Sequence, residues 1–82
     1  MDRTEANRIL AAILETVAAE PHGAPSGVMF AALQANGVSL DDYRALLTIA
    51  KSVGLVTEES HVVSITDKGR ETVSKIQAHR AA

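Results

Sequence analysis

The stretch GLVTEESHVVSITDKGR, residues 54–70, decides how this chain is expected to fold. It contains two short runs rich in aliphatic and β-branched residues, 55–57 and 61–65, separated by the polar residues EES. Two such runs on either side of a short polar segment predict a β-hairpin. Thr66 follows the second run at once, and threonine is a favoured residue for the start of a helix. The stretch therefore predicts a hairpin that leads directly into a helix.

Three segments before the hairpin have the apolar periodicity of amphipathic helices. We expect the first over about residues 4–19, the second over about 26–35 and the third over about 40–53. Each follows or begins with a residue type that caps helices. The predicted N-caps of these three helices and of the last one are Asp2, Ser26, Ser39 and Thr66.

The apolar residues of these segments predict the core. In the second helix we expect some combination of Val28, Met29, Phe30 and Leu33 to be buried. In the third helix the predicted inward face consists of Leu40, Tyr43, Leu46, Leu47, Ala50 and Val53, and in the last helix it consists of Val73 and Ile76. The predicted order is helix, helix, helix, hairpin, helix, which is a mainly α fold with a small β-hairpin.

The length and composition limit what the chain can be. Its 82 residues are enough for a single domain, which we place at 1–82 with a core of about 4–78. There is no cysteine, which excludes disulfides and cysteine-based zinc sites. The net charge of −2 gives no overall attraction to nucleic acid or to anionic lipid, so a DNA-binding protein of this composition needs its basic residues on one face.

The sequence predicts neither a membrane protein nor an enzyme. Its most apolar run, ILAAIL, has six residues, far fewer than the roughly 20 that a membrane-spanning helix needs. We expect a cytoplasmic protein without a secretory signal, because Asp2 and Glu5 interrupt any basic leader. The three histidines lie on different predicted elements, and no catalytic or phosphate-binding motif is present. We therefore expect no catalytic residue, no metal and no cofactor.

The sequence YRALLTIAKSVGLVTEESHVVSITDKGRETV, residues 43–73, resembles winged helix-turn-helix domains. It is similar to repressors of the multiple-antibiotic-resistance and phenolic-acid-decarboxylase types, and more so to small archaeal winged-helix chromatin proteins, whose second helix is similar to SGVMF. The resemblance covers about residues 6–77 and implies a dimeric, DNA-binding transcriptional regulator. It also implies that Gly69 lets the last helix approach its neighbours. Unlike the chromatin proteins, this chain has only Val73 and Ile76 for a C-terminal coiled coil.

In such domains the third helix enters the major groove and the hairpin, or wing, reaches the DNA backbone. A helical wheel of the third helix places Asp41, Ala45, Thr48 and Ser52 outward when its apolar face is buried. The predicted DNA-binding residues are Arg44 and Lys51 for phosphates, Thr48 and Ser52 for base edges, and His61 for the backbone. Four acids oppose binding to double-stranded DNA: Asp41 and Asp42 at the start of the helix, and Glu58 and Glu59, which we expect at the hairpin tip.

A second interpretation is a winged helix that binds a protein or a second copy of itself. The nearly neutral strip of Ala45, Thr48, Ile49 and Ser52 can pack on a partner, as can the alanine-rich side of the first helix, formed by Ala11, Ala12, Ala18 and Ala19. The only aromatic residues, Phe30 and Tyr43, are expected in the core, so we predict no platform for base stacking.

Overall fold

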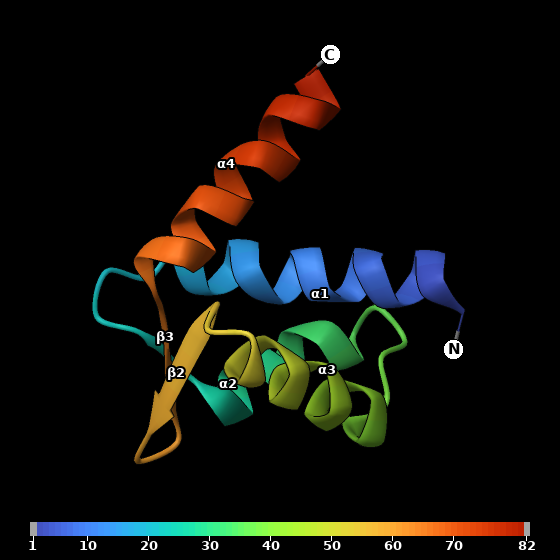
Figure 1. Cartoon of the computed structure of the whole chain (residues 1–82). Coiled ribbons are helices and arrows are strands. Elements are labelled where there is room, and N and C mark those ends of the chain that lie inside the picture. The colour runs from blue at the N-terminus through green and yellow to red at the C-terminus, as the bar shows by residue number, and fades with distance from the viewer. Residues whose placement is uncertain (1, 82) are drawn as a thin grey trace.

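The computed structural model describes residues 2–81 (Figure 1). This part of the chain folds into four helices and a small three-stranded antiparallel sheet. The elements in chain order are α1 (Arg3–Ala18), β1 (Ala24–Pro25), α2 (Ser26–Gln34), α3 (Leu40–Ser52), β2 (Val56–Glu59), β3 (Val62–Ile65) and α4 (Asp67–Ala81). The predicted mainly helical fold with a hairpin between the third and last helices is confirmed.

Side chains cap three of the helices, as predicted. Asp2 accepts a hydrogen bond from the backbone N–H of Glu5 at 2.7 Å, and Ser39 accepts one from Asp42 at 3.1 Å. The predicted cap of α2 is wrong: Ser26 is the first residue of that helix and its side chain makes no cap hydrogen bond. Pro25, which is paired in β1, occupies the N-cap position of α2 instead. The Ser26 hydroxyl forms a hydrogen bond with the hydroxyl of Tyr43 at 2.8 Å.

The sheet has the strand order β1-β3-β2, so the central strand is β3. The two-residue strand β1 pairs with β3 in the register Ala24↔Val63 and was not predicted, because alanine and proline carry no strand signal. The hairpin joins β2 to β3 in the register Val56↔Ile65 to Glu59↔Val62.

The hairpin turn differs from the expected one. Its two central residues are Ser60 and His61, both with positive φ, at 52° and 65°. A two-residue turn with two left-handed residues matches the twist of the flanking strands, and it lets pairing continue as far as Glu59. Glu58 and Glu59 therefore lie in β2, and their predicted position at the tip is wrong.

The core lies between α1, α3 and the inner face of the sheet. Ile13, Val17, Ala50 and Val63 are fully buried, and Met29 and Leu33 are the buried members of the set predicted for α2. Three apolar side chains that could have joined the core are substantially exposed: Val28 at 65%, Leu40 at 40% and Val53 at 46%. Leu40 begins α3 and Val53 directly follows its last residue, so the predicted inward face of that helix is buried only along its middle.

Thr66 and Gly69 fix the start of α4 against the end of α3. The Thr66 hydroxyl donates to the carbonyl of Gly54 at 2.6 Å and of Leu55 at 3.0 Å, and accepts from the backbone N–H of Gly69 at 3.0 Å. A Cβ at Gly69 would overlap the carbonyl oxygen of Leu55. The role that the resemblance implied for this glycine is confirmed. From this junction α4 crosses α1 and projects away from the other elements (Figure 1).

Candidate functional site

The exposed face of α3 has the composition predicted for it. Asp41, Ala45, Thr48 and Ser52 are all exposed, because the opposite side of the helix packs on the core. The Ser52 hydroxyl donates to the carbonyl of Ile49 at 2.9 Å, so its proton is engaged within the helix. Ile49 is 48% exposed on the same helix.

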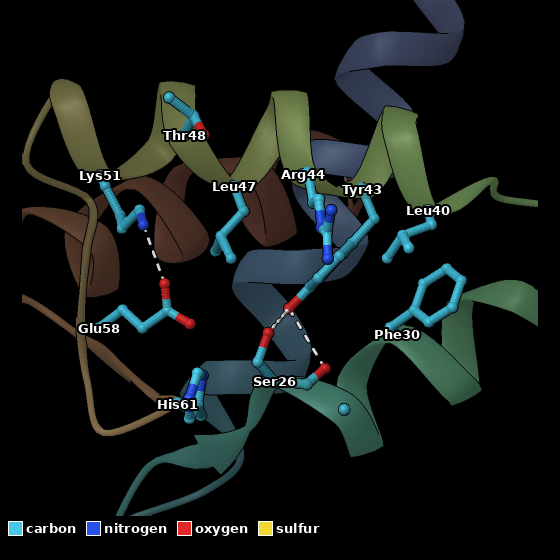
Figure 2. A pocket seen from close by; sticks show the side chains of 11 residues that line it. Ser26, Phe30, Leu40, Tyr43, Arg44, Leu47, Thr48, Lys51, Glu58 and His61 are labelled. Atoms are coloured by element: carbon cyan, nitrogen blue, oxygen red, sulfur yellow. Dashed lines mark hydrogen bonds and ion pairs between the residues drawn. The ribbon is translucent and has the colours of Figure 1, made fainter.

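A hollow of about 430 Å³ lies between α2, α3 and the hairpin, and we call it the α3 hollow (Figure 2). Four of the five predicted DNA-binding residues line it: Arg44, Thr48 and Lys51 from α3, and His61 from the hairpin turn. Ser52 is not among its lining residues. The structure thus brings side chains from two separate predicted elements to one place.

One side of the α3 hollow is polar. The Nζ atom of Lys51 lies 2.9 Å from Oε1 of Glu58, and His61 lies on the same side of the hollow (Figure 2). Glu58 follows Val56 by two residues, so the alternation of the strand turns it toward α3, as it does the buried Val56. The side chain of Glu58 is only 21% exposed, and its carboxylate neutralises the lysine beside it.

The other side of the α3 hollow is apolar, with Arg44 at its edge. Phe30 and Leu40 lie on this side, and Arg44 extends from α3 into the hollow between them and His61 (Figure 2). Tyr43 is 2% exposed, and its ring centroid lies 5.7 Å from that of Phe30. Tyr43 is therefore core, as predicted, whereas Phe30 is only partly buried and lines the hollow.

Other arginine side chains are distributed over other surfaces. Arg8 lines a groove between α1 and α4 together with Arg80, and Arg70 lines a third hollow beside Glu15. None of these three lines the α3 hollow. The permanent positive charge in the α3 hollow therefore comes from Arg44 and Lys51.

The four acidic residues near α3 lie in different positions and have different effects. Asp41 and Asp42 lie in the first turn of the helix, where a negative charge is favourable to the helix dipole. Glu59 is exposed on β2, whereas Glu58 faces the hollow. The hairpin turn itself carries a hydroxyl and an imidazole, and the exposed Glu59 directly precedes it.

Within residues 2–81 no three histidine or acidic side chains come close enough to share a metal ion. In the same part of the chain, each helix is too short or too polar to cross a membrane. Comparison of the chain with protein-family models, with curated proteins and with solved structures gave no match.

Sequence reasoning missed the residues that shape the hollow around the predicted cations. Phe30 and Leu40 were assigned to the core by their apolar character, and Glu58 was assigned to the hairpin tip. The signal for Glu58 was available: a hairpin with a two-residue turn places it on the strand face that it shares with Val56. No comparable signal in the sequence indicates the contact between Ser26 and Tyr43, which joins residues 17 positions apart.

Proposed function

We propose that this chain is a winged-helix domain that binds double-stranded DNA through α3 and the hairpin, and that it acts in transcription regulation. The order of helices and strands and the resemblance of residues 43–73 to winged helix-turn-helix domains support the proposal. The observation that carries it is the position of four predicted contact residues around one hollow on the exposed side of α3.

In the proposed complex α3 faces the major groove. Thr48 is directed outward and offers a hydroxyl to base edges. Ser52 can only accept a hydrogen bond there as long as its hydroxyl donates to the carbonyl of Ile49. Arg44 and Lys51 contact phosphates on one flank of the helix, and His61 reaches the backbone from the hairpin turn.

The charge of this surface predicts weak, salt-dependent binding. Each phosphate contact contributes about −0.9 to the slope of log K against log salt concentration, so two or three contacts give a slope of about −2 to −3. Lys51 must also exchange Glu58 for a phosphate. We expect dissociation constants at the weak end of non-specific binding, on the order of 10⁻⁴ M at physiological salt and tighter at low salt.

A pair of charge-reversal variants tests the proposal by fluorescence anisotropy with a labelled duplex of mixed sequence. Arg44→Glu with Lys51→Glu should abolish binding. The matched control, Arg70→Glu with Lys75→Glu, changes the net charge equally on residues that do not line the α3 hollow, and it should retain most of the affinity. Equal loss in both variants, or no binding by the parent chain at low salt, would contradict the proposal.

A second candidate function is the binding of a protein partner through the same helix. Ile49 and Val53 are four residues apart and 48% and 46% exposed, which gives the C-terminal end of α3 an uncovered apolar patch. If this patch binds a partner or a second copy, Ile49→Gln with Val53→Gln should abolish association in sedimentation experiments and leave DNA affinity unchanged. A chain that is monomeric before and after the change contradicts self-association through this patch.

A further inference from the structure

We propose that α3 is selective for thymine, whose C5 methyl group it recognises in the major groove through the methyl groups of Ala45 and Thr48. This inference rests on the proposed binding of DNA by α3, and it names the base that the helix prefers. It is drawn from the four side chains at the centre of the exposed face of α3, which are Asp41, Ala45, Thr48 and Ser52.

The centre of this face is poor in hydrogen-bond donors. Asp41 carries a carboxylate, which only accepts, and the hydroxyl of Ser52 already donates to the carbonyl of Ile49 at 2.9 Å. The side chain of Ala45 has neither a donor nor an acceptor. The hydroxyl of Thr48 is therefore the one donor that these four side chains offer to a base edge.

Guanine and adenine are poor matches for such a face. Guanine presents two acceptors, O6 and N7, which are read by arginine or lysine. Here Arg44 extends into the α3 hollow, and Lys51 is paired with Glu58 at 2.9 Å (Figure 2). Adenine is read by the side-chain amide of asparagine or glutamine, and α3 has neither residue. The centre of the exposed face thus lacks the side chains that form bidentate contacts with purines.

Thymine matches the same face with both of its major-groove groups. Its edge carries the acceptor O4 and the C5 methyl group, and Thr48 carries a hydroxyl and a methyl group. Ala45 lies three residues before Thr48, which places their Cβ atoms about 5–6 Å apart on one side of the helix. Both residues are exposed and small, so they allow a close approach of the helix to the base edges. The pair therefore offers an apolar surface on which a thymine methyl group can pack.

Cytosine is the alternative base, because Asp41 can accept a hydrogen bond from its N4 amino group. The cytosine edge has no methyl group, so the methyl groups of Ala45 and Thr48 would gain no apolar contact from it. The DNA phosphates also repel the carboxylate of Asp41. We therefore expect a preference for A·T pairs that depends on the thymine methyl group.

Replacement of thymine by uracil removes only this methyl group from the DNA, and fluorescence anisotropy at low salt measures the effect. Three labelled duplexes of equal length are compared: one has a central A·T run, the second has uracil in place of every thymine of that run, and the third has a central G·C run. We expect the parent chain to bind the thymine duplex about fourfold more tightly than the uracil duplex, which corresponds to about 0.8 kcal/mol for one buried methyl-sized group. It should also bind the thymine duplex more tightly than the G·C duplex.

Matching deletions in the protein identify the contact. Thr48→Ser removes the methyl group and keeps the hydroxyl, so it should reduce the ratio of the two affinities from about fourfold to less than twofold. Thr48→Val removes the hydroxyl and keeps the methyl group, so it should preserve the ratio. Ala45→Ser, which exchanges a methyl for a hydroxymethyl group, should lower it.

Thr4→Ser is the matched control, because it deletes the same methyl group from an exposed residue of α1. It should change neither affinity. Unchanged circular dichroism of all four variants establishes that the fold is intact.

The outcomes separate this inference from the proposal on which it rests. Equal binding of the thymine and uracil duplexes overturns the base preference and leaves DNA binding by α3 in place, as does tighter binding of the G·C duplex. A preference for thymine that persists in both Thr48→Ser and Ala45→Ser overturns its assignment to these residues. Binding to none of the three duplexes overturns the proposed function itself, and the base preference with it.

Discussion

Lys51 and Glu58 join the end of α3 to the hairpin through an ion pair of 2.9 Å, although they come from elements on either side of a turn. The lysine side chain is 39% exposed and the glutamate side chain 21%, so the pair is partly shielded from solvent. Glu58 therefore acts as an internal counter-ion in the proposed DNA-binding face. Any phosphate that approaches Lys51 competes with a carboxylate that is already in place.

Removal of this counter-ion should strengthen DNA binding. In Glu58→Gln, Lys51 is free to contact a phosphate, so we expect affinity for a duplex to rise severalfold at low salt and the log–log salt slope to steepen by about 1. Fluorescence anisotropy over a range of salt concentrations measures both quantities.

Glu59→Gln is the matched control, because it removes the same charge from the next residue of the same strand, where the side chain is exposed and forms no ion pair with a residue between 2 and 80. It should raise affinity much less and leave the slope unchanged. Identical effects of the two substitutions would mean that net charge alone matters. The loss of a partly exposed pair should lower the free energy of unfolding by no more than about 1 kcal/mol.

Two glycine-to-alanine substitutions should have opposite effects on stability. A Cβ at Gly69 overlaps the carbonyl oxygen of Leu55, which is backbone and cannot move aside cheaply. Gly69→Ala should therefore lower the free energy of unfolding by about 3 kcal/mol, at the upper end of the cost of overpacking. Gly27, in the first turn of α2, has no positive φ and no atom within 4 Å of an added Cβ, so Gly27→Ala should raise it by about 0.4–1 kcal/mol.

Urea denaturation of both variants measures these differences. A Gly69→Ala protein as stable as the parent would show that α4 can shift away from Leu55 without loss. The positions of α4 and of the α3–β2 junction would then be less tightly linked than the hydrogen bonds of Thr66 indicate.

Residues that readily adopt a left-handed backbone conformation should make the hairpin turn more stable. Ser60 and His61 have φ values of 52° and 65°, and such a turn is most stable with asparagine and glycine at these two positions. Ser60→Asn with His61→Gly should raise the free energy of unfolding by about 1 kcal/mol, because a left-handed conformation costs a non-glycine residue at least about that much. Thermal unfolding detects the change, and a lower midpoint would argue against the turn geometry.

Much of the fold follows from local sequence signals. The aliphatic periodicity of the first and third helices, the caps at Asp2, Ser39 and Thr66, and the paired β-branched runs each depend on neighbouring residues, and each predicted its element. The features that were missed are set by contacts over longer distances. Ala24–Pro25 becomes a strand only because β3 lies beside it, and Phe30 and Leu40 stay partly exposed only because of how α2 meets α3.

In the candidate site, too, some features follow from neighbouring residues and others depend on contacts over longer distances. A helical wheel was sufficient to place Thr48 and Ser52 on the exposed face and Arg44 and Lys51 on its flank. The pairing of Lys51 with Glu58 required the hairpin register, because a shift of one residue would turn Glu58 away from α3. The sequence pattern placed both glutamates at the hairpin tip, whereas the two-residue turn places both in β2 and directs Glu58 toward α3.

Arg80 should hold the projecting part of α4 near α1. Its Nη1 donates to Oε2 of Glu15 at 3.0 Å and lies 2.7 Å from Oε1, which is buried and accepts no hydrogen bond from the described residues. Beyond Ile76 the helix has no large apolar side chain, so this ion pair is the main contact that holds its C-terminal part.

Arg80→Gln should therefore accelerate amide hydrogen exchange in the last turns of α4 by up to about fivefold, which corresponds to about 1 kcal/mol for a partly exposed pair. Lys75→Gln removes the same charge from a pair with Glu71 that stays within α4, and it should have a smaller effect on those turns. Exchange rates that do not differ between the two variants would mean that α4 keeps its position by the packing of Val73 and Ile76 alone.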